Sequence, residues 1–214
     1  MEKYLIVDTE TANGLDCPVM YDFGFAVIDE KGKVYYKASY VIAEVFFDKE
    51  LMTSAYYAEK IPMYIERINN GESKLITLFN LRNEVFHIIK KYNINKIVAH
   101  NARFDYLSTH TTQRYLTCSK SRFFFPYGVK YIDTLKMARN ALKNNEKYKA
   151  FCIDNGYLTK RNQLRFTAEI IYRFLAQNND FKEEHTGLSD VMIEKEIFAF
   201  CKETCPDFNG FLWE

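Results

Sequence analysis

The sequence predicts an α/β fold in which a mixed sheet of about five strands is flanked by helices in a single domain. Strand-like segments come first and include a hairpin, and strand-like and helix-like segments then alternate along the chain. A hydrophobic fraction of 48% over 214 residues supplies one sizeable core and excludes a disordered chain. We expect one domain over residues 1–214, with residues 204–214 as a peripheral tail.

Short apolar runs rich in β-branched residues predict the strands, and the tight-turn composition of residues 29–32 predicts the hairpin. The strands are expected, in order, at residues 4–7, 21–28, 34–42, 96–99 and 129–132. Apolar residues three and four apart predict the helices; Pro62 should break the first of them, and Asp133 should cap the fourth. The helices are expected at residues 53–68, 74–91, 104–117, 134–143, 146–154, 164–177 and 187–203.

The charge is balanced overall but unevenly distributed. The chain carries 29 Lys and Arg against 28 Asp and Glu, which excludes a polycation that holds nucleic acid by net charge alone. Residues 114–165 carry 12 basic and 3 acidic groups, a net charge of +9, and are a candidate surface for a phosphate backbone. A solvated helix face is the more common origin of such a run, so both interpretations stay open.

Five cysteines without a CxxC pair favour reduced thiols and a cytoplasmic location. No apolar run approaches the length of a membrane span, and the start of the chain has Glu2 where a signal peptide would be basic. We therefore expect no membrane association.

Two short motifs place carboxylates at the ends of predicted strands. Asp8 and Glu10 alternate after the first strand, so their side chains share a face, about 6.6 Å apart at Cα, and repel unless a cation or proton lies between them. Asp105, in His100-Asn-Ala-Arg-Phe-Asp105, emerges where open α/β sheets bind ligands if its strand lies beside the first. His100 itself is expected to be packed or hydrogen-bonded. Taken singly, Asp8 and Glu10 are more simply explained as acids at a solvent-exposed strand end, and Asp105 also suits the first turn of a helix, where it complements the helix dipole.

The third motif, His185-Thr-Gly-Leu-Ser-Asp190, opens the last helix. Asp190 lies on the apolar stripe of that helix with Ile193 and Ile197, where a carboxylate is costly unless it is paired or coordinated. His185 is about 140° out of alignment with Asp190 on a regular helix, so it must reach Asp190 from the preceding loop. A neutral imidazole there can accept a proton near pH 7.

Asp8-Thr-Glu10, His100-Asn-Ala-Arg-Phe-Asp105 and His185-Thr-Gly-Leu-Ser-Asp190, in this order, resemble the three motifs of the DEDD exonuclease superfamily, in its histidine-containing DEDDh branch. That branch includes the proofreading epsilon subunit of bacterial DNA polymerase III, ribonuclease T and oligoribonuclease. The resemblance spans residues 4 to about 203 and implies a ribonuclease H-like fold. The family often has Ala where this chain has Gly187, a difference not expected to affect the chemistry.

The resemblance implies a metal-dependent 3′–5′ exonuclease that releases nucleoside 5′-monophosphates from single-stranded 3′ ends, with DNA favoured over RNA. It implies that two Mg²⁺ or Mn²⁺ ions are held by four carboxylates, those of Asp8, Glu10, Asp105 and Asp190. His185 would be the general base that takes a proton from the attacking water. The terminal nucleotide would contact Thr9, Thr11, Ala12, Asn101 and Phe104, or an aromatic residue of 52–57.

Two alternatives stay open: an exoribonuclease of the same family, and a catalytically silent module that binds single strands or a polymerase. The intact set of four acids and His185 argues against the silent module. We expect any polymerase or replication partner to be a separate chain, because nothing in residues 1–214 resembles a polymerase.

Overall fold

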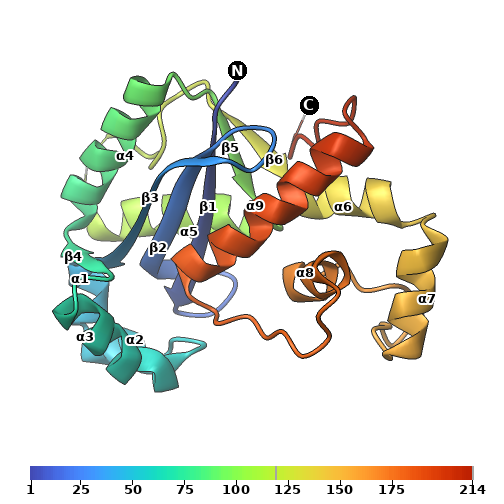
Figure 1. Ribbon diagram of the computed structural model, residues 1–214. Helices are drawn as coiled ribbons and strands as arrows, with labels where there is room; N and C mark the ends of the chain where they lie inside the picture. Colours follow the sequence, from blue (N-terminus) through green and yellow to red (C-terminus); the bar gives the residue numbers. More distant parts are fainter. Residues whose placement is uncertain (119, 214) are drawn as a thin grey trace.

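The computed structural model describes residues 1–118 and 120–213, and a twisted mixed sheet forms its centre (Figure 1). The strands of this sheet lie in the order β4-β3-β2-β1-β5-β6. β1 pairs antiparallel with β2, and β2 with β3, whereas β4, β5 and β6 pair parallel with their neighbours. Their bounds are β1 Tyr4–Ala12, β2 Val19–Ile28, β3 Val34–Ile42, β4 Lys74–Ile76, β5 Lys96–Ala99 and β6 Lys130–Asp133.

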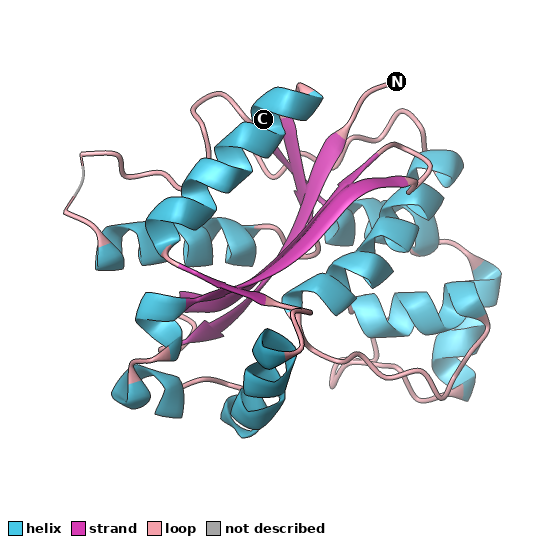
Figure 2. Cartoon of the chain, turned by 60° about the vertical axis from the view of Figure 1, so that its left-hand side comes forward, coloured by secondary structure: helices cyan, strands magenta, loops and turns pink. Residues whose placement is uncertain are grey.

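Helices cover both faces of the sheet (Figure 2). One apolar core joins a face of the sheet to residues of α1, α2, α3 and α4, and the other joins the opposite face to α6, α7, α8 and α9. α5 contacts β1 and β2. The helices are α1 Ala43–Phe46, α2 Lys49–Thr53, η1 Ala58–Lys60, α3 Ile61–Asn69, α4 Leu78–Tyr92, α5 Arg103–Leu116, α6 Thr134–Leu142, α7 Glu146–Asp154, α8 Ala168–Ala176 and α9 Gly187–Thr204.

The α/β class and the flanked mixed sheet are confirmed, but the described part of the sheet has six strands rather than five. Residues 74–76, which were expected to begin a helix, pair with β3 as β4, and α4 begins after the Thr77 cap. β1 continues to Ala12, beyond its expected end at residue 7, because its pairing with β2 continues through a bulge between Glu10 and Thr11. Asp8 and Glu10 therefore lie inside a paired strand.

The helix expected over 53–68 is wrong: α2, η1 and α3 share this region. Pro62 lies in the first turn of α3, where its missing N–H has no intrahelical partner to lose, so it begins a helix instead of breaking one. The helix expected over 164–177 begins only at Ala168. Asp133 caps α6 as predicted, accepting a hydrogen bond from the Leu135 N–H at 2.9 Å.

The C-terminal residues lie beside β6. The Asp133 N–H donates to the Gly210 carbonyl at 2.9 Å, and the Leu212 N–H donates to the Tyr131 carbonyl at 2.8 Å. All five cysteines are free. Within residues 1–118 and 120–213, no helix has both the length and the apolar character that crossing a membrane requires. The division of the chain into one domain and a peripheral tail stays a prediction.

Candidate active site

A cleft of about 630 Å³ opens at the carboxyl ends of β1 and β5. Most of its lining residues come from β1, the start of α5, α6, the segment before α8, the loop before α9 and the first turns of α9. All five residues to which the sequence motifs assign chemistry line it, namely Asp8, Glu10, Asp105, His185 and Asp190. The structure therefore brings together side chains from three segments that are far apart in the chain.

Asp8 and Glu10 alternate along β1 and both border the cleft. Burial, together with the charges of Glu194 and Asp105, raises the pKa of Asp8 well above its usual range. Burial and the nearby carboxylate of Asp22 raise the pKa of Glu10 to about 9. Both shifts have one physical origin, which is negative charge gathered in a partly desolvated space.

Asp105 is held in place by its neighbour on β1. It lies in the first turn of α5 and is only 2% exposed. Thr9 Oγ1 donates to Asp105 Oδ1 at 3.0 Å and also lies 2.8 Å from Ser108 Oγ. Burial raises the pKa of Asp105 to about 7, although the Thr9 hydrogen bond acts in the opposite direction.

His185 reaches the cleft from the loop before α9, as predicted. Its Nδ1 lies 3.8 Å from Asp190 Oδ2 and 3.7 Å from Glu183 Oε2. Its ring stacks on Tyr57 with centroids 4.7 Å apart, and its backbone adopts a left-handed φ of 51°. A non-glycine residue held in this conformation is uncommon and is often found at functional sites. Burial and the nearby charge of Lys60 lower the pKa of His185, so the imidazole is neutral at pH 7.

Two cations that sequence reasoning missed hold the loop that carries His185. Lys60 Nζ donates to the carbonyl oxygens of Glu184 and His185 at 2.5 and 3.2 Å. Arg67 Nη1 donates to Thr186 Oγ1 at 3.0 Å, and Arg67 also pairs with Glu184. These residues lie more than 100 positions before the loop, and no local pattern in the sequence marks the contact.

Glu194 is a further carboxylate at the site that sequence reasoning missed. It lines the cleft one helical turn after Asp190 and is 3% exposed. Its Oε2 is buried and has no hydrogen-bond partner among the described residues. A signal was present, because Glu194 lies on the same apolar stripe of α9 as Asp190 and Ile197, where a lone carboxylate is costly.

Two glycines bring α9 close enough to β1 and β2 to complete the cleft. A Cβ on Gly24 would lie 2.0 Å from the Gly187 carbonyl carbon, and a Cβ on Gly187 would lie 2.5 Å from the Gly24 nitrogen. Asp22 Oδ2 accepts a hydrogen bond from the Gly187 N–H at 2.8 Å at the same contact. This chain therefore requires glycine at position 187, because a methyl group there would overlap the backbone of β1 and β2. That the difference from the family's Ala leaves the chemistry unaffected stays a prediction.

The predicted substrate residues divide into two groups. Thr9, Asn101 and Phe104 line the cleft, whereas Thr11 and Ala12 are not among its lining residues, and the Ala12 side chain is buried in the core. These placements leave the predicted roles untested.

Two neighbouring residues bear on the helix start. α5 has Ala102, not Asn101, at its N-cap. The Asn101 N–H donates to Asp133 Oδ1 at 3.0 Å, and its φ is 62°. His100 is hydrogen-bonded as expected: its Nδ1 and Nε2 lie 2.9 Å from Thr134 Oγ1 and from the Phe166 carbonyl. His100 therefore supports the wall of the cleft.

The basic segment 114–165 contributes to the cleft in part. Arg139 and Arg165 line it, whereas the other ten basic residues of the segment do not. Lys136, for example, donates to the carbonyls of Phe211 and Leu212 in the C-terminal tail. The +9 run therefore combines cleft residues with structural and solvated ones.

Two sets of side chains could each hold a metal ion. Glu10, His185 and Asp190 present ligand atoms that all lie within 4.8 Å of one another, and so do Glu169, Glu183 and His185. His185 belongs to both sets, so its position suits a ligand as well as a base.

Solved structures with a similar fold include exonuclease I proteins. Exonuclease I from Methylocaldum szegediense superposes with a TM-score of 0.61 at 14% identity, over 97% of this chain and 42% of that one. The zinc-bound complex of E. coli exonuclease I with single-stranded DNA gives 0.59 at 13% identity, over 96% and 42%. A complex of the E. coli enzyme with a dA16 oligonucleotide gives 0.56 at 14% identity, also over 96% and 42%.

The chain thus spans about two fifths of the length of these exonuclease I chains. No protein-family model and no curated protein matches the sequence. At this level of identity the likeness defines the fold, which is the ribonuclease H-like fold of exonuclease I.

Proposed function

We propose that this chain is a divalent-metal-dependent 3′–5′ exonuclease that acts on single-stranded DNA and releases nucleoside 5′-monophosphates. The observation that carries the proposal is the gathering of Asp8, Glu10, Asp105 and Asp190 around one cleft, with His185 at the same cleft. The exonuclease I fold and the single-stranded DNA bound by those proteins support this choice of reaction and substrate.

The donor set fits hard divalent cations. Carboxylate oxygens from β1, α5 and α9 lie in a partly desolvated space, where burial and neighbouring carboxylates raise the pKa of Asp8, Glu10 and Asp190. Glu194 adds a buried oxygen without a hydrogen-bond partner in the described chain. Anionic oxygens in excess over nearby positive charge are the ligands that Mg²⁺ and Mn²⁺ prefer.

In this proposal Asp8, Glu10, Asp105 and Asp190 hold two ions, and Glu194 adds negative charge behind Asp8 and Asp105. When bound, such ions withdraw charge from the entering and leaving oxygens of a phosphodiester displacement. Thr9 fixes the orientation of Asp105 through its hydrogen bond. β1 therefore supplies two of the proposed ligands, Asp8 and Glu10, and also the residue that positions Asp105.

His185 acts as the base that accepts a proton from the attacking water. Its lowered pKa keeps the imidazole unprotonated at pH 7, as this role requires. Stacking on Tyr57 and the hydrogen bonds from Lys60 to the loop carbonyls hold the ring at the cleft. Phe104, which also lines the cleft, offers a face on which the last base can stack.

The test is degradation of single-stranded DNA and RNA of equal length, labelled at either end, with Mn²⁺, Mg²⁺ or EDTA. We expect the 3′ label to leave as a mononucleotide while the 5′-labelled strand shortens stepwise, with DNA degraded faster and EDTA abolishing both. Release of the 5′ label first would contradict the polarity, and faster loss of RNA would contradict the substrate. If both the DNA and the RNA stay intact in the presence of metal, the proposal that this chain is an exonuclease would be contradicted.

A further inference from the structure

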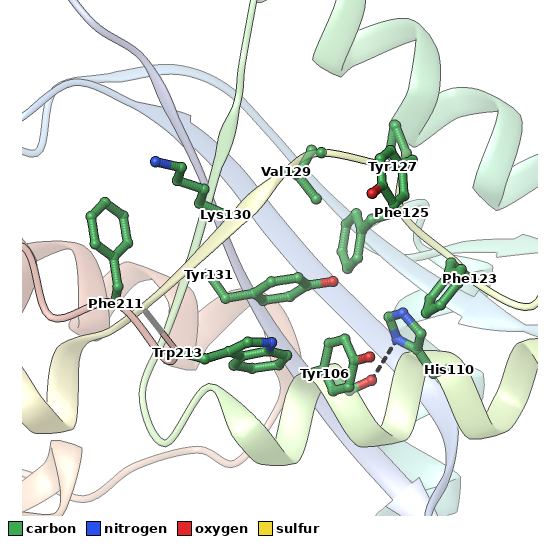
Figure 3. Close-up of a pocket in the computed structure, with 12 residues that line it drawn as sticks. Tyr106, His110, Phe123, Phe125, Tyr127, Val129, Lys130, Tyr131, Phe211 and Trp213 are labelled. Carbon is green, nitrogen blue, oxygen red and sulfur yellow. Dashed lines mark hydrogen bonds between the residues drawn. The ribbon is translucent and has the colours of Figure 1, made fainter.

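A second cavity lies at the β6 edge of the sheet, apart from the active-site cleft. Its volume is about 380 Å³, within the range of small-molecule sites, and its lining residues come from α5, the segment 123–131 and the C-terminal tail (Figure 3). The two cavities have no lining residue in common. This space is therefore a separate cavity that the proposed reaction does not use.

Aromatic rings form most of its walls. Tyr131 and Trp213 stack with planes 5° apart, and Tyr106 meets both edge-on with centroids 5.2 and 4.8 Å away. Phe123 lies at the mouth and remains 46% exposed. Exposed aromatic faces that border a hollow are suited to a flat ring, because stacking needs only an apolar face on each partner.

His110, which lines the pocket, offers a hydrogen-bonding group there. His110 Nδ1 lies 2.7 Å from the Tyr106 carbonyl, an acceptor, so the ring proton is on Nδ1. Burial lowers the pKa of His110 to about 4, so the ring is neutral and Nε2 is an acceptor. Figure 3 shows the Tyr131 hydroxyl pointing toward the side of the pocket where Phe125 and His110 lie. The pocket thus offers an acceptor and a hydroxyl between apolar faces.

The charge around the pocket selects the class of ligand. Among the described residues that line the pocket, Lys130 carries a positive charge and none is acidic. Lys130 Nζ lies 5.1 Å from the centre of the Phe211 ring at the pocket wall. A flat ring with polar edges on an anionic backbone fits the aromatic walls, the hydrogen-bonding groups and the positive charge of the pocket. An apolar side chain of a protein partner would leave the His110 acceptor unpaired.

We infer that this pocket binds a nucleobase of a single-stranded nucleic acid, at a site separate from the catalytic cleft. The choice of nucleic acid rests in part on the proposed function, whereas the flat ring and its polar edge follow from the pocket itself. Such a site would hold a second point of the strand while the 3′ end occupies the cleft.

Trp213 makes the inference directly measurable, because it is the only tryptophan of the chain and lies in the pocket wall. We would titrate the full chain with adenosine in EDTA, excite Trp213 selectively and follow its emission. The expected result is saturable quenching. In Phe123→Ala, which removes the exposed ring at the mouth, binding should weaken about 5- to 150-fold, the effect of one lost stacking contact. Phe47→Ala, which removes an exposed ring elsewhere, should bind as the parent does.

His110→Asn tests the hydrogen-bond acceptor of the pocket separately. The Asn amide can still donate to the Tyr106 carbonyl, whereas the Nε2 acceptor is lost. Adenosine should therefore bind more weakly to this variant also. If Phe123→Ala fails to fold, Tyr127→Ala removes the fully exposed ring of the lining instead. The absence of saturable quenching, equal binding by Phe123→Ala and Phe47→Ala, or quenching by an uncharged apolar tripeptide but not by adenosine would overturn the inference. Because EDTA abolishes the proposed catalysis, binding here and hydrolysis there can fail independently.

Discussion

Gly24→Ala tests whether the close approach of β2 and α9 builds the active site. A Cβ on Gly24 would lie 2.0 Å from the Gly187 carbonyl carbon, 2.1 Å from the Leu188 nitrogen and 2.4 Å from the Gly187 oxygen. Ordinary contacts begin at 3.4 Å, so the start of α9 must move by about 1.4 Å. All three obstructing atoms belong to the backbone, so no side-chain rotation relieves the overlap.

The displacement has two expected consequences. Overpacking of this kind costs about 1–3 kcal/mol, which corresponds to a fall in melting temperature of about 2–12 °C for a chain of this size. Because α9 carries Asp190 and the loop before it carries His185, both groups move relative to Asp8 and Glu10. A misplacement of about 1 Å lowers rates about 100-fold.

The assay combines thermal melting with the rate of mononucleotide release from single-stranded DNA. Gly156→Ala is the matched control, since a Cβ there meets nothing within 4 Å and the cost is limited to its φ of 70°. This control should lose stability by about 1–2 kcal/mol and keep the rate of the parent. A Gly24→Ala protein with the melting temperature and the rate of the parent would refute the reasoning.

Three further predictions concern the charges of the cleft. Asp8→Asn should lose both Mn²⁺ affinity, measured by calorimetry, and the rate of mononucleotide release. His185→Ala should lose rate but keep most of its Mn²⁺ affinity. Equal loss of affinity in the two variants would make His185 a ligand. Folding raises the pKa of Glu10 to about 9 and that of Asp105 and Asp190 to about 7, so these acids bind protons more tightly in the folded state. Their stabilising contribution is complete below about pH 4 and is lost as the pH rises through 7 to 9. The melting temperature in EDTA should therefore fall between pH 7 and 9, and a rise would contradict the raised pKa values. Glu194→Gln should melt higher in EDTA at pH 8, because repulsion with Asp105 and Asp190 is relieved, and it should gain less stability from Mn²⁺ than the parent. Unchanged melting in both conditions would exclude Glu194 from the charged cluster.

The fold class and the proximity of the five motif residues could be predicted because both follow from short local patterns in the sequence. Apolar runs mark β1, β2 and β5, and the carboxylates follow these runs or enter helices at fixed spacings. The position of His185 before α9 follows from helical geometry alone.

The features that the sequence analysis missed or predicted wrongly depend on contacts between segments that are distant in the sequence. β4 is three residues long and is defined by its pairing with β3, so its sequence does not distinguish it from the start of α4. The bulge that extends β1 beyond Glu10 depends on the register with β2. The need for glycine at 187 depends on Gly24, and the support of the His185 loop depends on Lys60.

The most direct test of the central claim is a crystal structure of the chain with Mn²⁺ and thymidine 5′-monophosphate, with the manganese located by anomalous scattering. The expected result is two peaks about 3.5–4 Å apart, ligated by Asp8, Glu10, Asp105 and Asp190. An empty carboxylate cluster, or manganese bound only by Glu169, Glu183 and His185, would contradict it.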